Sequence, residues 1–166
     1  DNTFAQLDRC RNLIPVLSIE GGKEITDSRR GEGVYDRAVH AMGLMRERKI
    51  PFGISCCYTS ANFEQVSTPA YIDQMSAWGA MFVWYFHYMP VGKNAVMDLM
   101  PTIEQRVDII NTLRRVRSDE CDIPFFPMDF QNDGEYVGGC IAGGRRYLHI
   151  NANGDMDPCV FIHYSD

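Results

Sequence analysis

The sequence predicts an α/β fold, in which a small parallel sheet with helical crossovers is followed by a short antiparallel hairpin. Apolar, strand-like segments alternate with amphipathic helical segments, a pattern typical of parallel strands joined by right-handed crossovers. The chain has 166 residues, of which 45% are hydrophobic and 23% charged, which suits one globular core. Four such strands are too few for an eight-stranded barrel of roughly 250 residues. They suit an open sheet or part of a barrel.

Four short apolar runs are expected to form the parallel strands. They are residues 14–20, 50–57, 81–87 and 123–130. Two prolines weaken the last of them as a strand. The glycine-rich, charged stretch 21–33 is expected to be a loop that leads into the first helix.

Three helices are expected between these strands. The first, residues 32–49, has an apolar stripe at three- to four-residue spacing: Val34, Ala38, Met42 and Met45. The second begins at Thr68-Pro69, a capping threonine followed by proline at the first helical position, and runs to about Gly79. The third begins with a capping box of Thr102 and Gln105. Its expected buried side carries Ile103, Val107, Ile110 and Leu113.

The end of the chain follows a different pattern. Residues 147–150 and 156–161 are two short apolar runs, and Asn153-Gly154 stands between them. Asn-Gly favours the tight turn of a hairpin. We therefore expect a small antiparallel appendage after the α/β body.

Composition excludes several classes of protein. Sixteen Lys and Arg against 22 Asp and Glu give a net charge of −6, which argues against a nucleic-acid binder. The longest apolar run, 81–89, is too short for a membrane helix. No signal peptide is present, so a cytoplasmic location is expected. The chain begins at Asp1 and stops at Asp166 within a structured segment, so we expect it to be a piece of a longer protein.

Polar residues gather at the carboxyl end of the first strand, where parallel sheets bind their ligands. Ser18 and Glu20 share one face there. The alternative is that Glu20 is simply the exposed first residue of the loop. Arg29 and Arg30 precede a helix and are suited to hold an anionic group, unless they belong to a solvated loop.

Four further residues lie near the expected open end of the sheet. They are Tyr85, His87, Asp129 and Asp133. Each could contact a substrate or serve only the fold.

Two of the six cysteines form a candidate metal site in the tail. Cys140 is followed by 13 residues, Gly154, four residues and Cys159. His149 and His163 would complete a tetrahedral zinc site. An iron–sulfur cluster normally takes four thiolates and would need ligands outside this chain. The third interpretation is two unrelated buried cysteines.

Residues 17–59 resemble the second half of the barrel of radical S-adenosylmethionine (radical SAM) enzymes. The family's fourth strand reads Ser-Ile/Leu-Asp/Glu-Gly and is followed by Asp-x-x-Arg-Gly. Here Ser18, Glu20, Gly21, Asp27, Arg30 and Gly31 match in order and spacing. The tail, Cys140-x13-Gly154-x4-Cys159, is similar to the opening of the cysteine-rich SPASM extension.

This resemblance implies that residues 1–130 form the C-terminal half of a partial (β/α) barrel and that 131–166 begin a SPASM-like extension. It implies an iron–sulfur oxidoreductase that cleaves S-adenosylmethionine to a 5′-deoxyadenosyl radical for hydrogen abstraction. Ser18, Glu20 and Arg30 would bind that cofactor. Cys140 and Cys159 would ligate an auxiliary [4Fe–4S] cluster. Substrates of such enzymes are often peptides or proteins, and sometimes small molecules.

The sequence departs from the family in lacking the Cys-x3-Cys-x2-Cys loop that holds the catalytic cluster. We therefore expect these 166 residues alone to be inactive. Half a barrel also leaves an exposed parallel edge, through which we expect a homodimer. The alternative to an enzyme is a non-catalytic α/β scaffold that binds zinc through the tail.

Overall fold

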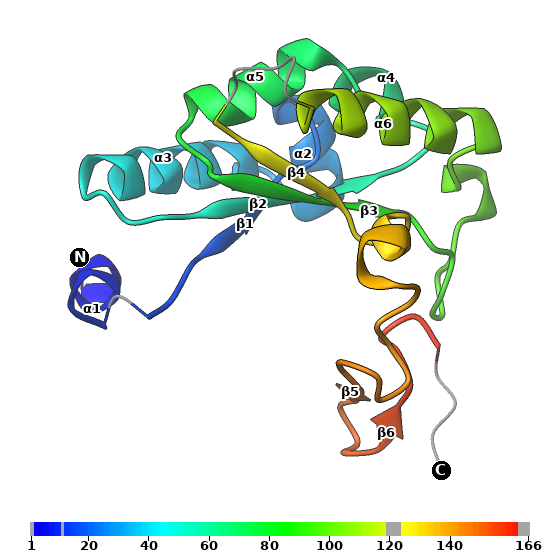
Figure 1. Ribbon diagram of the computed structural model, residues 1–166. Helices are drawn as coiled ribbons and strands as arrows, with labels where there is room; N and C mark the ends of the chain where they lie inside the picture. The colour runs from blue at the N-terminus through cyan, green and yellow to red at the C-terminus, as the bar shows by residue number, and fades with distance from the viewer. Residues whose placement is uncertain (1, 11, 119–123, 163–166) are drawn as a thin grey trace.

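The computed structural model describes residues 2–10, 12–118 and 124–162, and its centre is one parallel sheet (Figure 1). The strand order is β1-β2-β3-β4. The strands are β1 (Val16–Ser18), β2 (Gly53–Tyr58), β3 (Phe82–His87) and β4 (Phe126–Asp129). Every neighbouring pair is parallel, and helical segments connect the strands. The predicted fold class is therefore confirmed.

Six helices and two 3-10 turns accompany the sheets in the described residues. The helices are α1 (Asn2–Cys10), α2 (Lys23–Arg30), α3 (Val34–Glu47), α4 (Phe63–Val66), α5 (Pro69–Ala77) and α6 (Ile103–Val116). The 3-10 turns are η1 (Met97–Leu99) and η2 (Asp133–Val137). Both predicted caps are confirmed: Thr68 accepts from the Tyr71 amide at the start of α5, and Thr102 and Gln105 form a capping box at the start of α6.

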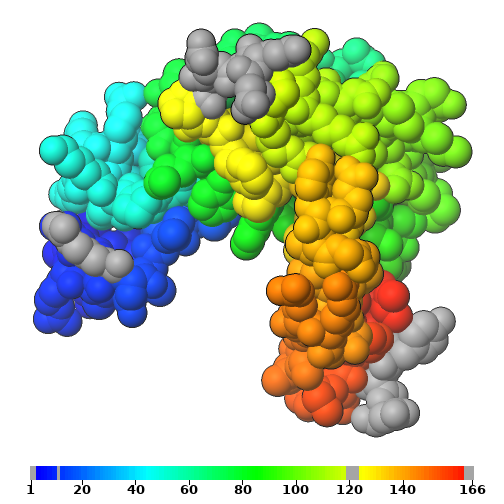
Figure 2. Space-filling model, in the orientation of Figure 1, coloured from blue at the N-terminus to red at the C-terminus, as the bar shows by residue number. Residues whose placement is uncertain are grey.

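The helices cover one face of the sheet, and the other face is open. The covered face carries the core side chains of β2 and β3, namely Ile54, Cys56, Tyr58, Val83 and Tyr85. Aromatic residues of β3 alternate with these and point to the open face, as strand geometry requires. Figure 2 shows the hollow beneath the sheet, between the α1 segment and the C-terminal tail.

Two predictions, one for a loop and one for the buried side of a helix, are wrong in part. Stretch 21–33 is not all loop, because α2 occupies most of it and buries Thr26. On α6, Ile103 is 74% exposed and Val107 is 48% exposed. The buried stripe is Ile109, Leu113 and Val116. Both stripes have helical spacing, so only packing against the sheet decides between them.

β1 and β4 are the edge strands of the sheet as described. β1 is shorter than the predicted 14–20, since Leu13 and Ile14 lie exposed before it. An unpaired edge offers backbone groups to another chain. Dimerisation through it stays a prediction.

The tail forms the expected hairpin. β5 (His149–Ile150) pairs antiparallel with β6 (Met156–Asp157). Asn151 Oδ1 accepts from the amides of Asn153 and Asp155, at 2.9 and 3.0 Å, and Gly154 takes a positive φ of 95° in the turn. Among the described helices, none is long and apolar enough to cross a membrane.

Candidate functional site

A buried carboxylate marks the carboxyl end of β1. Glu20 is 0% exposed, so its interpretation as an exposed loop residue is wrong. Arg30 Nη2 lies 2.5 Å from Glu20 Oε1, and Arg29 Nε lies 3.5 Å from the same oxygen. The second oxygen, Oε2, is buried and has no hydrogen-bond partner among the described residues. A buried acceptor without a partner costs free energy and suits a site that a ligand donor completes.

Side chains of α2 and α5 accept hydrogen bonds from the backbone amides of Glu20 and Gly21. The Glu20 amide donates to Thr26 Oγ1 at 3.1 Å, and the Gly21 amide donates to Tyr71 Oη at 2.9 Å. Gly21 has a φ of 112°, and an added Cβ there would overlap the Gln65 side chain. The positive φ therefore favours glycine at this turn, and a larger residue would also have to displace the end of the Gln65 side chain.

Asn62 ties the ends of β1 and β2 together. Its Nδ2 donates to the carbonyls of Glu20 and Cys57, at 3.2 and 3.1 Å. Its Oδ1 accepts from the Thr59 amide at 2.7 Å, and Thr59 Oγ1 accepts from the Asn62 amide. Sequence reasoning missed this residue. The signal that could have found it is the Thr-x-x-Asn spacing directly after a strand, which resembles a reciprocal cap.

Asp27 organises the neighbouring helix instead of contacting the buried carboxylate. It accepts from the amides of Gly33 and Tyr35, at 3.1 and 2.8 Å. The Tyr35 amide is the largest cause that lowers the pKa of Asp27. The carboxylate thus satisfies free amides at the start of α3.

Cys57 joins the site from the open face of β2. Burial raises the pKa of the Cys57 thiol, and the positive charge of the nearby Arg29 guanidinium opposes this shift. The Arg29 guanidinium therefore lies between a carboxylate and a thiol. The structure brings together Glu20, Arg29, Arg30 and Cys57. Ser18 is half-buried and, among the described residues, forms no side-chain hydrogen bond with this cluster.

Two of the other candidates serve the fold on the covered face. Tyr85 is fully buried and donates to the Val66 carbonyl at 2.8 Å. The His87 ring packs edge-on against Tyr58, with ring centroids 6.2 Å apart. Burial, followed by the positive charge of Arg106, lowers the pKa of His87 to about 4.

The two aspartates stabilise the turn after β4. Asp129 is buried and accepts from the Asn132 amide and side chain, at 3.1 and 2.8 Å. Burial raises the pKa of Asp129, and these bonds oppose the shift. Asp133 pairs through two hydrogen bonds with Arg117, at 2.6 and 2.9 Å.

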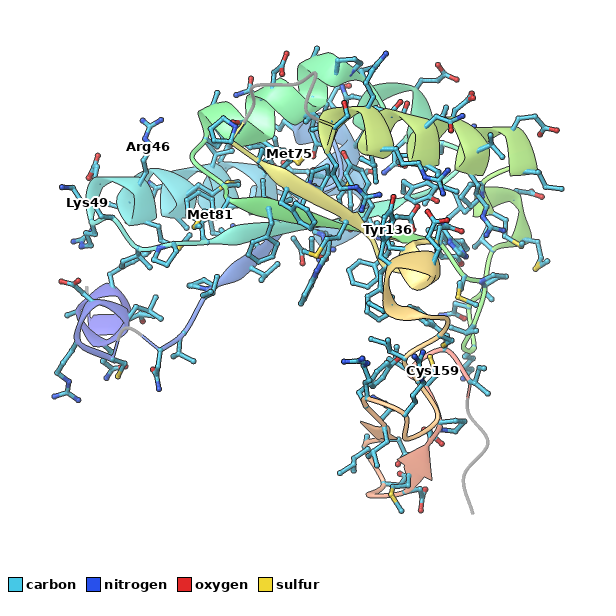
Figure 3. All side chains as sticks on the ribbon, viewed as in Figure 1. Arg46, Lys49, Met75, Met81, Tyr136 and Cys159 are labelled. Atoms are coloured by element: carbon cyan, nitrogen blue, oxygen red, sulfur yellow. The ribbon has the colours of Figure 1, made fainter. Side chains whose placement is uncertain are left out.

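The tail cysteines line one cavity together with Tyr147. Tyr147 Oη lies 3.2 Å from Cys159 Sγ, and Arg145 donates to the Cys140 carbonyl at 3.0 Å. Figure 3 shows Cys159 between the hairpin and η2. In the described ranges no three metal-binding side chains gather, so His149 does not join the two cysteines. His163 lies outside the described residues. Two thiols at one cavity fit part of a four-thiolate set.

No protein-family model and no curated protein matches the chain. Solved structures do. SuiB from Streptococcus suis is 16% identical and aligns over 89% of this chain and 38% of its own, with a TM-score of 0.62. SuiB bound to its precursor peptide SuiA is 18% identical over 89% and 37%, with a TM-score of 0.63. Native anSMEcpe with bound AdoMet (S-adenosylmethionine) and Cp18Cys peptide is 16% identical over 99% and 49%, with a TM-score of 0.67.

This chain therefore spans less than half the length of each of these structures. These structures share the fold of this chain. The neighbours are radical SAM enzymes. The parallel sheet with helical crossovers thus matches the part-barrel fold that the sequence resemblance implies.

Proposed function

We propose that this chain is a fragment of a radical SAM enzyme, comprising the C-terminal half of the barrel and the start of an extension, and that it binds S-adenosylmethionine at the carboxyl ends of β1 and β2. One observation carries the proposal: the wholly buried Glu20 pairs with arginine through one oxygen, and its other oxygen has no partner among the residues that the structure describes. The site lies at the sheet end where parallel folds bind ligands. A neighbour of the same fold was solved with S-adenosylmethionine bound.

Each candidate residue has a role that its position supports. Glu20 Oε2 would accept a hydrogen bond from a cofactor hydroxyl. Arg30 would position that carboxylate, and Arg29 carries a second positive charge beside it. Ser18 lies two residues earlier on the open face and would contact the cofactor from there. Bound to a reduced [4Fe–4S] cluster, S-adenosylmethionine supplies a 5′-deoxyadenosyl radical that takes a hydrogen atom from a substrate.

The tail, residues 131–166, would begin a SPASM-like extension in which Cys140 and Cys159 are the first ligands of an auxiliary [4Fe–4S] cluster. Both thiols reach the same cavity, which supports a shared metal group. The substrate class we propose is a peptide. Solved neighbours were bound to a precursor peptide and to the Cp18Cys peptide.

The Glu20→Gln variant tests the cofactor site. Glutamine keeps the shape but places an amide donor where Oε2 offers an acceptor, and it removes the charge that faces two arginines. Charge-assisted hydrogen bonds contribute roughly 1.5–3 kcal/mol. We therefore expect S-adenosylmethionine to bind the complete gene product about tenfold more weakly, by anaerobic equilibrium dialysis.

Asp36→Asn is the matched control, because Asp36 pairs with Lys23 on the exposed surface. Exposed pairs contribute little, so this variant should bind the cofactor within about twofold of the wild type. Circular dichroism verifies that both variants fold. Unchanged affinity in folded Glu20→Gln, or no measurable binding by the wild type, contradicts the proposal.

A further inference from the structure

An apolar cavity of about 450 Å³ lies where the open face of the sheet meets the C-terminal tail. Its sheet wall includes Trp84, Met128 and Phe130, and its tail wall includes Tyr147 and Phe161. The volume lies within the roughly 300–1,000 Å³ of ligand sites. The tail wall also includes Cys140 and Cys159, the proposed cluster ligands. The five aromatic and methionine side chains have no part in the proposed S-adenosylmethionine contacts.

Strand register places this cavity on the same row as the candidate cofactor site. Ser18 pairs with Ser55, Ser55 with Trp84, and Trp84 with Met128. These residues therefore cross the open face side by side. Neighbouring strands lie ~4.8 Å apart, so Trp84 is roughly 10 Å from Ser18 along the row. A group in the cavity lies within about one small-molecule length of a cofactor held at Ser18.

The aromatic side chains of the cavity pack against their neighbours and still leave apolar surface for a ligand. The rings of Phe86 and Phe130 have centroids 4.8 Å apart, and those of Phe130 and Phe161 are 6.5 Å apart. Trp84 Nε1 already donates to Met128 Sδ at 3.1 Å. Trp84 is nevertheless 38% exposed. An exposed indole whose one donor is used offers mainly its ring to a ligand.

Three polar side chains of the lining, Asp129, Gln131 and Asp133, form hydrogen bonds within the protein. Asp129 accepts twice from Asn132, and Asp133 pairs with Arg117. The Gln131 amide exchanges two hydrogen bonds with the backbone of β3. A ligand charge would therefore gain no free partner among these three side chains. The cavity selects by burial of apolar surface.

We propose that this cavity binds an apolar side chain, aliphatic or aromatic, of the peptide substrate and so presents the neighbouring backbone to the cofactor site. The peptide class of the ligand rests on the proposed function. The apolar preference rests on the lining.

Peptides of one design test the preference. Ac-Gly-Gly-X-Gly-Gly-NH₂ is titrated into the complete gene product by isothermal calorimetry, with X as leucine, phenylalanine, asparagine or lysine. Asparagine matches leucine closely in size and differs in polarity. Burying one aliphatic side chain predicts that the leucine and phenylalanine peptides bind at least about tenfold more tightly than the other two.

Two aromatic residues on the same face give a matched pair of variants. Trp84→Ala alters the cavity and should weaken binding of the leucine peptide by about tenfold. Phe126 does not line the cavity and is 54% exposed, so Phe126→Ala should bind within about twofold of the wild type. Met128→Gln keeps the size of the side chain and an acceptor for Trp84, and it should also reduce the preference for leucine over asparagine.

Equal affinity for the leucine and asparagine peptides overturns the proposal, as does an equal loss in Phe126→Ala. The titration needs neither cofactor nor cluster, so its outcome is independent of S-adenosylmethionine binding. A protein that binds the cofactor but shows no apolar preference refutes the cavity proposal alone. A protein that prefers leucine but never binds the cofactor refutes the proposed function and leaves the cavity preference established.

Discussion

His87 shows how burial of one side chain couples the fold to pH. It ends β3 on the helix-covered side, and its Nδ1 is buried without a hydrogen-bond partner in the described structure. Burial, then Arg106, lowers its pKa from 6.5 to about 4. Between these two values the unfolded chain binds the proton and the folded chain does not. Stability is therefore fully present above about pH 6.5 and is lost as the pH falls toward 4.

The expected loss between pH 7.5 and pH 4.5 is roughly 1–2 kcal/mol, because solvent screens a half-buried imidazole and reduces the full linkage effect. Urea unfolding at the two pH values measures it. The His87→Asn variant titrates the same carboxylates and should lose that much less stability on acidification. Equal losses in the two proteins would show that His87 does not couple folding to pH.

At the scale of single residues, the sequence predicts which charged side chains form the site, but it does not predict which distant residues contact them. The sequence could identify Glu20, Arg29 and Arg30 because all three lie within one stretch of eleven residues, 20–30, at the end of a predicted strand. Asn62 and Tyr71 lie 42 and 50 residues from their Glu20 and Gly21 partners. Only the parallel pairing of β1 with β2 brings such residues together, and local patterns do not encode that contact.

Among the elements, β2 depends on a glycine for its packing against β3. Gly53 and Phe82 are register partners, and an added Cβ at Gly53 would overlap the Phe82 ring. The Gly53→Ala variant should be less stable by about 1–3 kcal/mol, since the ring must move out of its place. Urea unfolding of Gly53→Ala, alone and combined with Phe82→Leu, measures this effect.

Gly43 supplies the control, because an added Cβ there meets no atom within 4 Å. It lies inside α3, where alanine is favoured over glycine by up to about 1 kcal/mol. Gly43→Ala should therefore leave stability unchanged or raise it, and Phe82→Leu should recover most of the loss in Gly53→Ala. A neutral Gly53→Ala would mean that the ring adapts without cost.

Predictions of elements succeeded where capping chemistry or alternation was strong. Thr68, Thr102 and the Asn-Gly turn each mark a boundary that the structure confirms. Helix α2 was missed because it begins after two glycines and its eight residues are mostly charged. The buried side of α6 was missed because two apolar stripes run along that helix, and only the sheet beneath selects one.

Over the whole molecule, the division of the sheet into a covered and an open face determines where ligands can bind. The buried carboxylate and the apolar cavity both lie toward the carboxyl ends of the strands, on or beside the open face. Alternation along strands predicts two faces but does not say which one helices cover. The sequence therefore placed Tyr85 and His87 near the site, whereas both belong to the covered side.

Anaerobic turnover of S-adenosylmethionine is the first experiment we would perform on the complete gene product. The protein is reconstituted with iron and sulfide, reduced with dithionite and given S-adenosylmethionine, and 5′-deoxyadenosine is quantified by mass spectrometry. We expect the wild type to release 5′-deoxyadenosine from S-adenosylmethionine. This release should fall at least about tenfold in Glu20→Gln and be retained in Asp36→Asn. A reconstituted protein that holds its cluster but neither binds S-adenosylmethionine nor releases 5′-deoxyadenosine would contradict the proposed function.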